Sequence, residues 1–209
     1  MTIEGVAEKT GLLLLITATV ALFTAFTATP ESAPAFIILG FLGSLVLFLF
    51  IVFKKSINPG LICAHSAFEG LVIGGFTWIF EVALDLPGIG IVAAILTFAI
   101  LAGMLTIYRA GLIAWNRNLA IAVASSVVAI FLIYIISFIG ALTGAFSVPY
   151  IHDATPIGIA FSLFVIGIGA LCLVADFDFI ERGVQSGARK ELEWIAAFGL
   201  MVTLVWLYI

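Results

Sequence analysis

The segment PAFIILGFLGSLVLFLFIVF, residues 34–53, decides the fold class of this chain. It contains no charged side chain over its whole length. A helix needs about 20 mostly apolar residues to cross a bilayer, because at about 1.5 Å per residue that length matches the hydrocarbon core. The segment therefore predicts a transmembrane α-helix.

The composition of the rest of the chain is equally apolar. Of 209 residues, 64% are hydrophobic and 10% are charged, against about 25% charged residues in soluble domains. A soluble protein with this composition would have too few polar groups to cover its surface. We therefore expect a lipid bilayer as the main partner and no nucleic acid; the net charge of −4 says little more about partners.

Six further apolar segments complete the pattern. We expect an all-α polytopic membrane protein with one domain, residues 1–209, and seven transmembrane helices near 11–28, 34–53, 61–81, 88–107, 118–141, 157–175 and 192–209. Turn-forming Pro, Gly and Asn or charged residues interrupt the apolar runs, and residues 176–193 are predicted as a polar link. Glu4 and Glu8 precede the first run, which is atypical of a signal peptide, so we expect that helix to be retained.

The basic residues indicate the orientation of the helices. With seven crossings, all eight Lys and Arg residues fall on one side: Lys9, Lys54, Lys55, Arg109, Arg117, Arg182, Arg189 and Lys190. The positive-inside rule makes that side cytoplasmic. We therefore expect a multi-pass protein of the cytoplasmic membrane with its N-terminus inside and its C-terminus outside.

Glu69 is the clearest ionisable residue at membrane depth. It lies about 12 Å along the third predicted helix. A charge is costly at such a position, so an ionisable residue found there suggests a functional role. His65 lies four residues earlier on the same helix face, where the carboxyl and imidazole groups could share a proton. Alternatively, Glu69 is protonated or bonded to a neighbouring helix and only aids packing.

A second group of acidic residues follows the sixth apolar run. Asp176 and Asp178 are two residues apart, so on a helix they face in nearly opposite directions. Asp176 lies closer to the apolar run and could point into the bundle, whereas Asp178 and Glu181 share a face that could pair with Arg182 near the surface. Glu193 begins the last predicted helix, where a helix N-terminus favours an anion.

Weaker candidates lie on the predicted outer side. Glu81 and Asp85 lie at the outer end of the third helix, and His152 and Asp153 lie in an outer loop. They could attract cations, but solvation at the membrane–water interface explains them more simply. They form no recognisable metal-ligand set, so we expect no metal site.

Several enzyme classes lack their sequence motifs. No H-E-x-x-H, G-x-S-x-G or Walker loop occurs, and no lysine inside a helix could form a retinal Schiff base. The glycines between Gly70 and Gly75 have helix-packing spacing. Cys63 and Cys172 lie inside apolar runs, where we expect packing roles rather than a disulfide. We expect no enzymatic activity and no cofactor.

Five short segments resemble a known family. They read ADFDFIERG (175–183), EW with AFGLMVTLVWLY (193–194 and 197–208), NPGL (58–61), AFEG (67–70) and AGM (102–104). Together they resemble the bacterial branch of the Bax inhibitor-1 (YccA-like) family over nearly the whole chain. Its members have seven helices and a cytoplasmic N-terminus. They usually continue past the position of Ile209, so the native chain is expected to extend further.

The resemblance implies a proton-sensitive calcium leak. In the family, a pair of aspartates on the last two helices forms the pH sensor, and Asp176 matches the first by position. The second has no counterpart, because the corresponding stretch 201–204 reads MVTL. Glu193 or Glu69 could supply the missing carboxylate, and Lys54 or Lys55 a basic partner.

Two functional hypotheses follow. The first is a pH-modulated calcium or cation leak in which Asp176, Glu69, Glu193 and His65 titrate or attract the transported cation. Two carboxyl groups held close cannot both ionise fully, so one would keep its proton near neutral pH. The second is a non-conducting regulator that binds a membrane protease or a stress-response partner. Calcium flux into vesicles discriminates between them.

Overall fold

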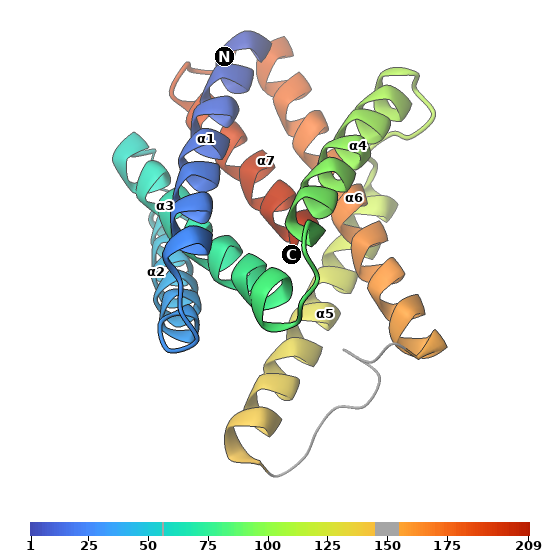
Figure 1. Ribbon diagram of the computed structural model, residues 1–209. Helices are drawn as coiled ribbons and strands as arrows, with labels where there is room; N and C mark the ends of the chain where they lie inside the picture. Colours follow the sequence, from blue (N-terminus) through green and yellow to red (C-terminus); the bar gives the residue numbers. More distant parts are fainter. Residues whose placement is uncertain (56, 145–154) are drawn as a thin grey trace. The chain divides into compact units, whose positions relative to one another are not determined.

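The computed structural model describes residues 1–55, 57–144 and 155–209 and is all-helical (Figure 1). Helices make up 84% of it, and the described residues contain no strand. The elements in chain order are α1 (Ile3–Thr27), α2 (Ala33–Lys54), α3 (Pro59–Trp78), the π-helical turn η1 (Ile79–Ala83), α4 (Ile89–Arg109), α5 (Arg117–Thr143), α6 (Pro156–Gln185) and α7 (Leu192–Tyr208). The predicted all-α fold with seven helices is confirmed.

Six of the helices in the described residues are long and apolar enough to cross a membrane: α1, α2, α3 with η1, α4, α5 and α6. Their outer faces carry large apolar side chains, such as Phe26 and Phe53, which are 85% and 79% exposed. A surface of this kind suits lipid rather than water. The shorter α7 has 17 residues, near the lower limit for a span, and its crossing stays a prediction.

The first helix begins earlier than the sequence predicts. Helix α1 starts at Ile3 rather than at residue 11, and the Thr2 hydroxyl caps it by accepting a 3.0 Å hydrogen bond from the Gly5 amide. Our boundary followed the apolar run alone. The polar residues Glu4, Glu8 and Lys9 instead belong to the first turns of α1, because a capped helix continues through polar residues.

The sixth helix ends later than predicted. Helix α6 continues to Gln185, so the predicted polar link from residue 176 is wrong over its first ten residues. The charged residues stabilise the added turns through i,i+4 contacts. Arg182 Nε lies 2.9 Å from Asp178 Oδ2, and Gln185 Nε2 donates to Glu181 Oε1 at 3.2 Å. The link is confined to the residues around Gly187, whose φ is +63°.

A π-helical turn ends the third helix. In η1 the Leu84 amide donates to the Ile79 carbonyl at 2.9 Å, a bond across five residues rather than four. The widened turn is followed by the predicted turn at residues 85–88, where Asp85 and Gly88 have φ values of +55° and +85°. Glu81 lies in the middle of η1.

The chain divides into two compact units. The first contains residues Met1–Ile100 and Asp178–Ile209, and the second contains Leu101–Phe177. Unit 2 is thus inserted in the sequence of unit 1. Within unit 2, Tyr108 packs against Phe177 with ring centroids 5.7 Å apart, and Tyr134 packs against Phe161 at 6.4 Å.

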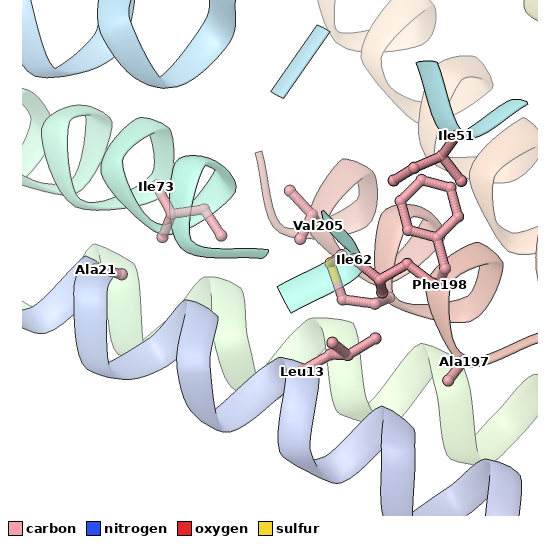
Figure 2. Packing of buried hydrophobic residues seen from close by; sticks show 9 residues of the cluster. Leu13, Ala21, Ile51, Ile62, Ile73, Ala197, Phe198 and Val205 are labelled. Carbon is pink, nitrogen blue, oxygen red and sulfur yellow. The ribbon is translucent and has the colours of Figure 1, made fainter. Parts of the chain in front are cut away.

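The core of unit 1 lies between α1, α2, α3 and α7. Helix α3 packs against both α1 and α2, and α7 packs against α1 and α3. Figure 2 shows side chains of the core cluster from these four helices. Leu13, Ile62, Ala197 and Met201 in this cluster are fully buried.

Small residues bring α1 and α3 into close contact. Gly70 and Gly74, four residues apart, face the backbone of α1 at Thr17 and Ala21, with no room for a Cβ. The Thr17 hydroxyl crosses the same interface and lies 3.0 Å from the Ser66 carbonyl oxygen. The predicted packing role of the glycine-rich stretch is therefore confirmed, because the absence of side chains permits this approach.

Candidate functional site

The predicted pair on α3 is present in unit 1. His65 Nε2 lies 3.6 Å from Glu69 Oε1, and their side chains are 1% and 17% exposed. The separation is longer than a hydrogen bond. The two side chains are therefore neighbours that are not hydrogen-bonded to each other. The i,i+4 spacing in the sequence predicted this proximity, since residues four apart lie on one helix face.

Three helices enclose this pair. The Ser44 hydroxyl of α2 lies near the Glu69 carboxyl and donates to the Phe41 carbonyl oxygen at 3.2 Å. The imidazole of His65 packs edge-on against Phe198 of α7, with centroids 4.9 Å apart, and lies 6.4 Å from the ring of Phe48 of α2. Sequence reasoning missed these neighbours, because no local pattern joins α2, α3 and α7.

The buried imidazole is incompletely hydrogen-bonded. Among the described residues, His65 Nδ1 has no hydrogen-bond partner. A buried nitrogen without a partner is costly, and native structures usually keep one only for a reason. The site therefore places a carboxyl group beside a buried imidazole that has an unused hydrogen-bonding nitrogen.

Glu193 occupies a different environment from the one predicted. It lies in the first turn of α7, as expected, but its carboxylate pairs with Lys9 of α1 at 2.5 Å. The Thr2 amide and hydroxyl donate to the same carboxylate at 2.9 and 3.2 Å, and the Lys9 ammonium lies 5.6 Å from the centre of the Trp194 ring. Glu193 thus joins the first turns of α1 and α7.

No local sequence pattern predicts this ion pair. Lys9 and Glu193 are 184 residues apart, so no helical periodicity relates them. The Glu193 side chain is 0% exposed and Lys9 is 16% exposed. Both charges are thereby compensated, which favours a structural role for Glu193.

The acidic residues of α6 have separate roles. Asp178 lies in the predicted pair with the exposed Arg182 but is itself only 16% exposed, and Glu181 accepts from Gln185. Asp176 is half-buried and lies four residues after Cys172 on the same helix. It belongs to unit 2, whereas Glu69 and Glu193 belong to unit 1.

The remaining candidates are dispersed. Glu81 Oε1 accepts a hydrogen bond from the Gly90 amide at 3.0 Å. His152 and Asp153 lie outside the described residues. The described part of the chain contains no group of three or more His, Cys, Asp or Glu side chains arranged to hold a metal ion.

Comparison with known proteins identifies the family. The family model described as Bax inhibitor 1 like matches residues 1–209, the whole chain. The chain belongs to this family. No curated protein and no solved structure matches it. Together with the apolar helices, membership makes this Bax inhibitor 1 like protein a multi-pass membrane protein.

The stretch 201–204 of α7 contains no acidic residue in this Bax inhibitor 1 like protein. Met201, Thr203 and Leu204 of α7 are buried, and the Thr203 hydroxyl donates to the Gly199 carbonyl at 3.1 Å. The nearest carboxylate in the sequence of α7 is Glu193, which the pair with Lys9 occupies. Of the predicted acids in the described part of unit 1, Glu69 is the one that lies beside a histidine.

Proposed function

We propose that this protein is a pH-modulated cation leak of the cytoplasmic membrane, with calcium as a transported ion, and that it catalyses no chemical reaction. The observation that carries the proposal is the His65–Glu69 pair, enclosed by α2, α3 and α7 in a Bax inhibitor 1 like protein. Ionisable groups at membrane depth are costly and commonly mark ion or proton pathways.

The pair has a simple electrostatic effect. When the imidazole is neutral and the carboxyl is ionised, the site carries a negative charge that attracts a cation. Proton binding to either group removes that net charge and with it the attraction. Asp176 would act in the same sense from α6, as its match to the family position implies, and Asp178 would not, because Arg182 already compensates its charge.

Flux measurements test this assignment. Purified protein in vesicles that contain a calcium-sensitive dye should conduct calcium, with different rates near pH 6 and pH 8, because proton binding to the carboxyl groups removes their charge. Asp176→Asn and Glu69→Gln should each flatten the response to pH, because each removes a titratable carboxyl group. Asp178→Asn is the matched control and should leave the response unchanged.

The outcomes separate the two hypotheses. Equal effects of the Asp176 and Asp178 substitutions would contradict the assignment to Asp176. A normal pH response of well-folded Glu69→Gln protein would leave Glu69 only a packing role. Complete absence of flux from the unsubstituted protein would favour the non-conducting regulator that binds a membrane protein such as a protease.

The proposed orientation has its own test. All eight Lys and Arg residues lie on one side if the chain crosses seven times, and that side should be cytoplasmic. A reporter that is active only in the cytoplasm should therefore work when fused at residues 113 and 187. It should be inactive at residues 31 and 86. Activity at residue 86 would refute both the orientation and the number of crossings before it.

A further inference from the structure

Unit 1 contains a cavity of about 510 Å³ that the pair on α3 does not explain. Segments of α1, α3, η1, α4 and α7 surround it. Most of its lining is apolar and includes Leu14, Ala21, Ile73, Ile91, Phe98 and Leu204. The volume lies within the range of small-ligand sites, and water would be poorly held against such walls.

The polar atoms deep in the lining are already satisfied. The Thr17 hydroxyl lies 3.0 Å from the carbonyl oxygens of both Leu13 and Ser66. The Thr97 hydroxyl donates to the Ala93 carbonyl at 2.9 Å. The hydroxyl groups of Thr17 and Thr97 are therefore not available to a ligand, and the main part of the cavity presents an apolar surface.

The remaining polar groups gather at one place. The Thr77 and Tyr208 hydroxyls are 2.8 Å apart, and the Gly90 amide donates to Glu81 Oε1 at 3.0 Å. A Cβ atom on Gly90 would lie within 3.1 Å of Thr77, Glu81 and Tyr208 atoms. The four residues therefore form one cluster, and it carries hydrogen-bonding groups from three separate helices and η1.

The charge of the cluster restricts what it can bind. Glu81 is the one charged residue among the lining residues that the structure describes, and none of these is Lys or Arg. Its carboxylate favours a cationic group and repels an anionic one. The cluster does not suit a bare calcium ion, because calcium takes about six to eight oxygen ligands and the cluster provides one carboxylate.

The position of the cluster along the helix matches a lipid headgroup. The span Pro59–Ala83 has 25 residues, about 37 Å of helix, and Glu81 lies two residues before its end. That depth corresponds to the boundary between hydrocarbon and headgroups. Leu22, Phe26 and Ile91 line the cavity and are exposed, so the cavity is open to the lipid on that side.

We propose that this cavity binds one acyl chain of an aminophospholipid, whose ammonium group pairs with Glu81. The apolar walls take the chain, and the carboxylate and hydroxyls at Glu81, Thr77 and Tyr208 take the headgroup. A π-helical turn is rare and often marks a functional site, and here it carries Glu81. The proposal does not depend on cation conduction.

Lipid binding to the purified protein tests the proposal. The probes are lysophosphatidylethanolamine and lysophosphatidylglycerol with the same acyl chain, counted by native mass spectrometry. We expect one bound molecule with about tenfold higher affinity for the amine lipid, as a charge-assisted hydrogen bond provides. Equal affinity for both lipids would refute the headgroup assignment.

Two variants separate chain binding from headgroup binding. Glu81→Gln keeps the acceptor for the Gly90 amide and should abolish the preference for the amine lipid while the chain still binds. Ala94→Phe fills the cavity from α4 and should abolish binding of both lipids. Ala102→Phe is the same change at an exposed position of α4 outside the lining and should bind normally. Normal binding by the Ala94 variant would overturn the proposal.

Discussion

Replacement of Lys9 by Met should destabilise the folded protein by about 2 kcal/mol, which is typical for a hydrogen bond to a charged group. The substitution leaves the Glu193 carboxylate, which is 0% exposed, without its cation. The cost should fall below the roughly 3–5 kcal/mol of deeply buried pairs, because the Thr2 amide and hydroxyl still donate to the carboxylate after the substitution. Chemical denaturation in detergent measures the change.

A second ion pair provides the matched control. Arg182 is 67% exposed where it pairs with Asp178, and exposed pairs contribute at most about 1 kcal/mol. Arg182→Met should therefore cost much less than Lys9→Met. The double variant Lys9→Met with Glu193→Gln should recover part of the lost stability, because no uncompensated charge remains. Equal stability of the two single variants would show that water reaches the Glu193 carboxylate.

Replacement of Gly74 by Leu should have the largest effect on the fold. A Cβ atom at Gly74 would overlap the Ala21 carbonyl oxygen and the Thr24 side chain of α1. Even one added methylene in a close-packed contact costs about 1–3 kcal/mol, and a leucine cannot be placed there without separating α1 from α3. We expect a large loss of monodisperse protein in size-exclusion chromatography and a lower melting temperature.

Gly11 offers a control on the neighbouring helix. A Cβ atom there would have no neighbour within 4 Å, so Gly11→Leu should be tolerated. The replacement should even favour the helix slightly, since Gly is a poor helix former. Normal folding of the Gly74 variant would mean that α1 and α3 can separate at little cost.

The sequence predicted those features that depend on local physical rules. Apolar length predicts the helices because every backbone group in lipid must be bonded within its own segment. Spacing predicts the proximity of His65 and Glu69, since residues four apart share a face. The same reasoning fails at the ends of α1 and α6, where helical turns continue through charged residues.

Features that join distant parts of the chain could not be predicted from the sequence. Lys9 and Glu193, the aromatic rings around His65 and the polar cluster at Glu81 each combine separate helices. No periodicity in a single sequence relates such positions. The π-helical turn was also missed, because its wider hydrogen bonds leave no compositional trace in the apolar run that contains it.

The division of the chain has a consequence for biogenesis. Unit 1 is built from both ends of the chain, and unit 2 is inserted between them. A ribosome delivers α1, α2 and α3 first, then about 77 residues of unit 2, and α7 last. Until α7 emerges, Leu13 and Ile62 lack their partners Ala197 and Met201. The nascent chain therefore has to stay in the membrane with an incomplete core until α7 has been synthesised.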